Sequence, residues 1–141
     1  MRLFYKSNIQ LNQKENMKID FKAMYDYILS LDNNVRFIGF IDEMGKLVYG
    51  GMRPGKISLE NETESIKIYM EYALINKIHT DFDTMLGKVI YSLTVREKIE
   101  LLTFPLEKYI IRISLERHTD SQKILYSILD YLKKLGSSST I

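Results

Sequence analysis

VRFIGFIDEMGKLVYGGMRPGK, residues 35–56, is the stretch of sequence that decides the fold. Residues 35–41 are apolar at both odd and even positions and rich in β-forming types, which is typical of a strand in the middle of a sheet. The turn that follows ends in Gly45, which can take the positive φ that a tight turn requires. Residues 46–52 then return as a second strand. The stretch therefore predicts a β-hairpin, followed by a loop over residues 53–56.

Helical periodicity flanks this hairpin on both sides. Asp20 is a candidate N-cap upstream, and Asn61 with Glu64 three residues later has the spacing of a capping box downstream. Thr119 with Gln122 is assigned the same role for the last helix. The predicted elements are, in order, a helix over 20–31, strands over 35–41 and 46–52, a helix over 61–77, a short helical turn over 80–86, strands over 88–95, 98–104 and 108–115, and a helix over 119–135 that Gly136 stops.

The order of these elements is α-β-β-α-β-β-β-α. Strands that come in two hairpin-linked blocks predict a single five-stranded antiparallel sheet covered by helices, an α+β fold. In the last strand, Ile111 and Ile113 alternate with Arg112 and Ser114. This period of two predicts one buried face and one more polar face.

Length and composition suit one domain with a real core. The chain has 141 residues, of which 45% are hydrophobic, and a net charge of +2. We divide it into a polar N-terminal extension (1–18), a folded domain (19–136) and a flexible tail (137–141). Acidic and basic residues are interspersed, so we expect no nucleic-acid partner and no membrane partner. The chain has no cysteine, which excludes disulfides and thiol chemistry, and the expected compartment is the cytoplasm.

The hairpin sequence also resembles a known family. VRFIGF at 35–40, followed by GKLVYGGMRPG at 45–55, looks like an archaeal roadblock-like family of unknown function. The element order over residues 19–136 is similar to that of roadblock (dynein-light-chain-type) domains and their profilin-like and longin-like relatives. The resemblance implies a domain that dimerises and that scaffolds or regulates small GTPases. It brings no catalytic residues with it, so we expect a protein that is not an enzyme and needs no cofactor.

The glycine-rich loop, residues 50–56, has the G-x-x-x-x-G-K spacing of a phosphate-binding loop. That chemistry needs Ser or Thr at the next position to hold magnesium, and this chain has Ile57. Pro54 also removes one of the backbone N–H groups that would line the phosphate cradle. We therefore expect no nucleotide to bind here and interpret Arg53 and Lys56 as solvated side chains.

The two histidines and the many aromatic residues are the remaining candidates for chemistry. His79 lies near Asp81 and Asp83, but one histidine with two loop acids is more typical of surface charge than of a metal site. The other histidine is His118. Ten tyrosines and six phenylalanines could stack on bases. Most of them occupy core-type positions and no basic stripe accompanies them, which argues against nucleic-acid binding.

The helix over 61–77 carries the clearest hint of a partner, because it is apolar on both sides. One side holds Ile66, Tyr69, Met70, Ala73 and Leu74, and the opposite side holds Ile68, Tyr72 and Ile75. A helix that is apolar all round is buried all round. A single sheet covers one side only, so the other side needs cover from a partner or from the N-terminal extension.

The resemblance implies that this helix and the strand over 88–95 pair with their copies about a two-fold axis. The predicted homodimer interface is Ile68, Tyr72, Ile75, Ile90, Ser92 and Thr94. A second hypothesis, from a different class, is a small-molecule sensor of profilin-like or PAS-like type with its ligand between sheet and helices. A pocket lined by convergent polar groups would favour the sensor.

Overall fold

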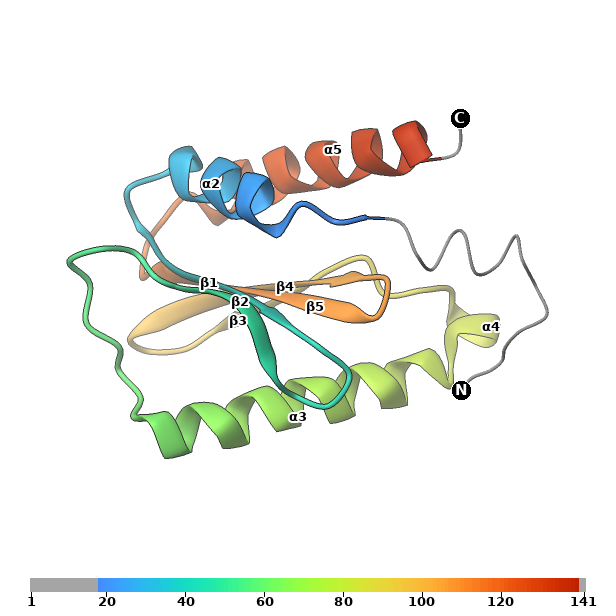
Figure 1. The fold of residues 1–141 in the computed structure, drawn as a ribbon, viewed down its shortest axis with the longest axis horizontal. Coiled ribbons are helices and arrows are strands. Elements are labelled where there is room, and N and C mark those ends of the chain that lie inside the picture. Colours follow the sequence, from blue (N-terminus) through green and yellow to red (C-terminus); the bar gives the residue numbers. More distant parts are fainter. Residues whose placement is uncertain (1–17, 140–141) are drawn as a thin grey trace.

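The computed structural model describes residues 18–139 and arranges them in three layers (Figure 1). The elements are α2 (Phe21–Leu31), β1 (Val35–Ile41), β2 (Leu47–Met52), α3 (Glu62–Thr80), α4 (Asp83–Leu86), β3 (Ser92–Val95), β4 (Ile99–Leu106), β5 (Tyr109–Glu116) and α5 (Ser121–Ser139). This is the predicted order. Residues 1–17 of the predicted extension and 140–141 of the predicted tail lie outside the described residues.

The five strands form one antiparallel sheet in the order β2-β1-β5-β4-β3. β1 pairs with β2 on one side and with β5 on the other, and Ile38 stands opposite Ile113 across the β1–β5 ladder. β5 also pairs with β4. The central strands are therefore β1, β5 and β4, and β2 and β3 are the edges.

The main core lies between the sheet and the layer formed by α2 and α5 (Figure 1). Its thirteen buried side chains are Met24, Ile28, Val35, Ile38, Phe40, Leu102, Phe104, Ile111, Ile113, Leu115, Ile124, Leu125 and Ile128. They come from both helices and from the three central strands. Burial of a large aliphatic or aromatic side chain contributes about 1.5–3 kcal/mol, so this layer holds most of the stability.

The layer on the other side of the sheet is a single helix, α3 (Figure 1). The buried hydrophobic cluster between α3 and the strands is small and consists of Phe37, Ile41 and Tyr69; we call it the Phe37 cluster. The turn of the β1–β2 hairpin also lies against α3. Gly45 has a φ of +80° there, and a Cβ at this position would lie 2.8 Å from Met70 Cα. The glycine is therefore required both by the turn and by the close approach of the helix.

Side-chain caps begin the long helices. Asp20 accepts a hydrogen bond from the Ala23 N–H at 3.0 Å at the start of α2. At the start of α3, Asn61 and Glu64 make the reciprocal capping box that their spacing predicted. The cap of α5 is Asp120, which accepts from the Lys123 N–H at 3.2 Å. The prediction of Thr119 as this cap was wrong.

Several boundaries differ from the prediction, among them the end of α3, which continues to Thr80. β3 spans four residues rather than the predicted 88–95. Continuing its ladder with β4 would set residue 90 opposite Pro105, which has no N–H to donate. β4 runs through Pro105 to Leu106, and the turn to β5 is made by Glu107, with a φ of 54°, and Lys108.

The last helix continues past Gly136 to Ser139. Glycine costs about 1 kcal/mol in a helix interior compared with alanine. It ends a helix when it adopts a left-handed conformation, and Gly136 does not have a positive φ. The predicted stop at Gly136 was therefore wrong, and residues 137–139 belong to α5 rather than to a tail.

Candidate functional site

Exposed apolar side chains concentrate on α3, on α4 and on the segment that ends in β3. Twelve of the eighteen exposed large hydrophobic residues in the described part of the chain fall in this stretch. They are Ile66, Met70, Leu74, Ile75, Ile78, Phe82, Met85, Leu86, Ile90, Tyr91, Leu93 and Val95, and we call them the α3–β3 surface. Apolar exposure on this scale marks protein interaction sites.

The side of α3 that faces the sheet combines residues from both of the sides that the sequence pattern separated, because the buried Tyr69 and the partly buried Ile68 both lie on it. Ile68 packs against the Phe37 cluster, and the ring of Tyr72 lies 5.6 Å from the guanidinium of Arg112 on the sheet. The outward side chains are Ile66, Met70 and Leu74, which are 55%, 56% and 59% exposed. The expectation that Ile68 and Tyr72 have no cover within the chain was wrong, because a helix that is apolar on both sides does not reveal which side meets the sheet.

Four of the six predicted interface residues still line one groove. Tyr72 and Ile75 on α3 and Ser92 and Thr94 on β3 surround a groove of about 180 Å³ between helix and strand. Ile90 precedes β3 and is 67% exposed. Whether these residues meet a second chain stays a prediction.

The arginine of the glycine-rich loop joins the end of α2 to β1 through hydrogen bonds. Arg53 donates from Nε to the Val35 carbonyl at 2.7 Å, and from Nη2 to the Leu29 and Asp32 carbonyls at 2.6 and 2.7 Å. The last carbonyls of a helix lack partners within the helix. Arg53 supplies those partners at the end of α2, and its interpretation as a solvated side chain was wrong.

The lysine of the same loop is also engaged. Lys56 Nζ lies 2.7 Å from Glu116 Oε2, and Arg36 Nη1 lies 3.1 Å from the same oxygen. The hydrogen bond from Lys56 lowers the pKa of Glu116 below its usual value, Arg36 adds to this, and partial burial acts in the opposite direction. The lysine that a phosphate-binding loop would need is thus already paired with a carboxylate.

Neither histidine belongs to a cluster that could hold a metal. No group of three or more His, Cys, Asp or Glu side chains suited to a metal ion occurs in residues 18–139. His118 has a φ of 65°, and its N–H donates to Glu100 Oε2 at 3.2 Å, which fixes the corner after β5. Within the same described range, no helix combines the length and apolarity that crossing a membrane demands.

Arg112, in the middle of β5, is the residue that the sequence analysis missed. It is 3% exposed, because α3 covers the face of the sheet that was predicted to be the more polar one. Its guanidinium lies 5.2 Å from the ring of Phe37 and 5.8 Å from that of Tyr69. Burial raises the pKa of Tyr69, and the charge of Arg112 partly offsets this effect. An arginine alternating with isoleucines carries no signal that a helix will bury it.

Comparisons with known proteins give one family match and several structural ones. A model for a family of unknown function, DUF6659, matches residues 11–138. A structure of MglB with a tetrameric arrangement is 10% identical, with a TM-score of 0.63 over 84% of this chain and 88% of that chain. Myxococcus xanthus MglB is 12% identical, with a TM-score of 0.61 over 87% of this chain and 99% of that chain. A roadblock/LC7 domain from Streptomyces avermitilis is 7% identical, with a TM-score of 0.59 over 88% of this chain and 99% of that chain.

A search of curated proteins finds no match. The structural likenesses rest on identities too low to carry more than the fold. They confirm the fold class that the hairpin sequence indicated, a single antiparallel sheet of the roadblock type. The archaeal origin implied by the resemblance stays a prediction.

Proposed function

Because the chain belongs to DUF6659, a family of unknown function, and has a roadblock-type fold, we propose that it is a non-catalytic dimerisation module of the cytoplasm. In this proposal it scaffolds or regulates a small GTPase. The α3–β3 surface is the observation that carries the dimer. The resemblance to roadblock domains supports the class of partner.

The dimer proposal follows from how little cover α3 receives. Tyr69 is the one buried residue of its nineteen, whereas Leu74, Ile75 and Ile78 are 59%, 40% and 46% exposed. An isolated helix layer of this kind leaves apolar area in contact with water, which costs free energy in proportion to the area. A second copy with the same surface would remove that area on both chains at once.

The edge of the sheet supports the same partner. β3 pairs with β4 on one side, and no described strand pairs with its other side. An unpaired edge offers a row of N–H and C=O groups to another chain. β3 is short, with Leu93 and Val95 43% and 55% exposed. Pairing of two such edges about a two-fold axis would extend the sheet across both chains and bring the two α3 helices together.

The oligomeric state tests the dimer directly. Sedimentation equilibrium of the full chain should show a monomer–dimer equilibrium or a stable dimer. Ile75→Glu should shift it to monomer, because the substitution places a charge in the apolar contact, while Lys77→Glu changes an exposed polar position on the same helix and serves as the control. If the chain stays monomeric at every concentration up to about 100 μM, any self-association is weaker than that of specific assemblies, and this result would contradict the homodimer.

The GTPase part needs a separate experiment. The chain, fixed to a resin, should retain a small GTPase from an extract of its source cell, identified by mass spectrometry. Retention should change when GDP is replaced by a non-hydrolysable GTP analogue, because a regulator distinguishes the two states by differential affinity. If no GTPase is identified among the captured proteins, this part of the proposal is refuted, while the dimer proposal is unaffected.

A further inference from the structure

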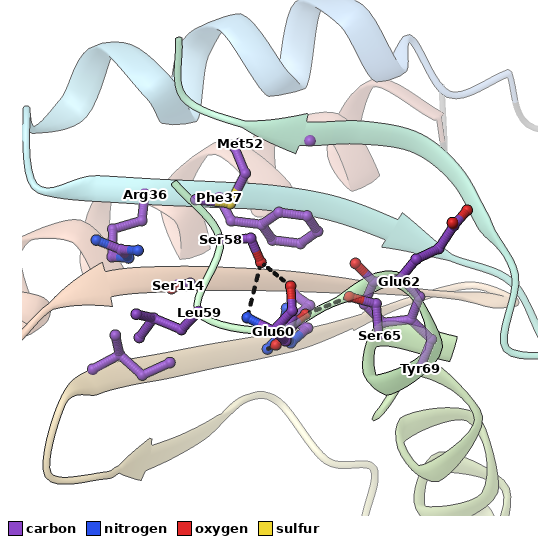
Figure 2. A pocket seen from close by; sticks show the side chains of 13 residues that line it. Arg36, Phe37, Met52, Ser58, Leu59, Glu60, Glu62, Ser65, Tyr69 and Ser114 are labelled. Atoms are coloured by element: carbon purple, nitrogen blue, oxygen red, sulfur yellow. Dashed lines mark hydrogen bonds and ion pairs between the residues drawn. The ribbon is translucent and has the colours of Figure 1, made fainter. Parts of the chain in front are cut away.

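A pocket of about 260 Å³ lies between the start of α3 and the sheet (Figure 2). Its apolar walls come from three elements: Phe37 on β1, Met52 on β2 and Tyr69 on α3. Ser58, Ser65 and Ser114 add hydroxyl groups. The volume is slightly below the roughly 300–1,000 Å³ of pockets that hold drug-sized ligands. The pocket therefore suits a small molecule.

Arg112 brings a buried positive charge to this pocket with donors to spare. Its Nε has no hydrogen-bond partner, and its Nη2 lies 3.5 Å from Glu60 Oε2, at the outer limit of a hydrogen bond. A guanidinium has five N–H donors, and a buried charge is normally paired and hydrogen-bonded. The rings of Phe37, Tyr69 and Tyr72 lie 5.2–5.8 Å from the guanidinium and stabilise the cation. Nε thus lacks an acceptor, and Nη2, on the same edge of the guanidinium, has only the distant Glu60 Oε2.

Glu60 stands next to this edge but is held mainly by other groups. Its Oε1 accepts a hydrogen bond from Ser65 Oγ at 2.9 Å. Its backbone N–H donates to Ser58 Oγ, and its carbonyl accepts from the same hydroxyl (Figure 2). The loop and the first turn of α3 therefore position Glu60. A second carboxylate that reached Arg112 would compete with a weak ion pair.

The lining of the pocket selects the class of ligand. A planar carboxylate matches the two-pronged edge formed by Nε and a terminal nitrogen of an arginine. Phosphate would bring more negative charge close to Glu60 and Glu62, which both line the pocket. The rings of Phe37 and Tyr69 wall the space beside the guanidinium. An apolar body attached to the carboxylate would lie against this pair of rings, which stack with their centroids 6.3 Å apart.

We propose that this pocket binds a small monocarboxylate with an aromatic or branched aliphatic body. The carboxylate takes the Nε edge of Arg112 and displaces Glu60 from it, and the body lies against Phe37 and Tyr69. The proposal does not depend on the homodimer or on the GTPase. It adds a ligand to a layer of the molecule that is otherwise thinly packed.

Benzoate is the probe, with benzyl alcohol as its neutral analogue and inorganic phosphate as a second anion. Each is titrated into the full-length chain, labelled with ¹⁵N, and the amide shifts of Ser65, Tyr69 and Ser114 are followed. Benzoate should give saturable shifts at these amides. Benzyl alcohol and phosphate should bind at least about tenfold more weakly, because benzyl alcohol lacks the carboxylate and phosphate lacks the apolar body.

Two variants separate a ligand site from a structural arginine. Glu60→Gln should tighten benzoate binding by about tenfold, since it removes the competing charge. Glu43→Gln, on the exposed hairpin turn, makes the same change in net charge and should leave the affinity as in the unmodified chain. Arg112→Lys keeps the charge but loses the planar edge, and should weaken binding by about tenfold or more.

The proposal is overturned if benzoate gives no saturable shifts at the pocket, or if benzyl alcohol or phosphate binds as tightly as benzoate. It is also overturned if Glu60→Gln and Glu43→Gln bind benzoate equally. If Arg112→Lys does not fold, the comparison of the two glutamate variants decides alone. Each of these contrary outcomes would mean that Arg112 has a structural role only, with its guanidinium stabilised by the rings of Phe37, Tyr69 and Tyr72.

Discussion

Truncation of Leu74 to alanine should weaken the proposed dimer without unfolding the chain. Leu74 lies on α3 and is 59% exposed. The substitution removes three carbon atoms, and each buried CH₂ group is worth about 0.8 kcal/mol, so a fully buried site would lose about 2.4 kcal/mol. Scaled by the area that is still open to a partner, the loss is about 1.4 kcal/mol per chain. A two-fold interface contains the substitution on both chains, so the loss is about 2.8 kcal/mol per dimer. This loss corresponds to a hundredfold rise in Kd.

Sedimentation equilibrium of the unmodified chain and of Leu74→Ala measures this difference. Alanine is the strongest helix former, so the helix itself should not suffer, and a thermal melt of the monomer checks that. Tyr126→Ala is the matched control, because Tyr126 is also 59% exposed but lies on α5 in the opposite layer. If Leu74→Ala changes the Kd no more than Tyr126→Ala does, the α3–β3 surface is not the dimer contact.

Three further outcomes follow from the ion pairs and hydrogen bonds of the fold. Glu116→Gln should lower the free energy of unfolding by up to about 1 kcal/mol at pH 7. Lys56 and Arg36 lower the pKa of Glu116 in the folded state. The difference in stability should therefore be full above the ordinary pKa of 4.5 and should be lost as the pH falls through the lower pKa of the folded state; urea titrations that show an equal difference at pH 7 and in acid would contradict this origin. Arg53→Met should cost about 2–3 kcal/mol in the same assay, since it leaves three carbonyls without a charged donor. Lys22→Met breaks an exposed pair and should leave the free energy of unfolding nearly unchanged. Calorimetric titration with ATP or GTP should show no saturable binding, and binding that Lys56→Ala abolishes would refute our interpretation of the glycine-rich loop.

The fold could be predicted from the sequence because its signals are local. The β1–β2 hairpin is specified by an apolar run, a glycine that can take positive φ and a second run. The caps at Asp20 and Asn61 are equally local, and both are present. Element boundaries that depend on a neighbouring strand were harder to predict from the sequence. The start of β3 is set by what stands opposite it on β4, which only the register reveals.

The sides of α3 and the depth of Arg112 could not be predicted, for a shared reason. Both depend on which way α3 lies on the sheet, and α3 is apolar on both sides. With Ile68 and Tyr72 facing inward, the polar alternation of β5 is buried rather than exposed. Sequence periodicity reports the direction of a side chain from its own backbone. It does not report what another element later places on top.

The position of β5 has a consequence for how the chain is made. β1 leaves the ribosome before β2 and β5; it can pair with β2 once the hairpin is complete, but its other edge has no partner until β5, which follows roughly 70 residues later. At about 5–20 residues per second, that interval lasts about 4–14 s. During it, β1 has one open edge and only the part of the core that α2 supplies. Newly made chains are therefore exposed to wrong partners in this interval, and a chaperone that binds extended apolar segments would find its target in VRFIGFI.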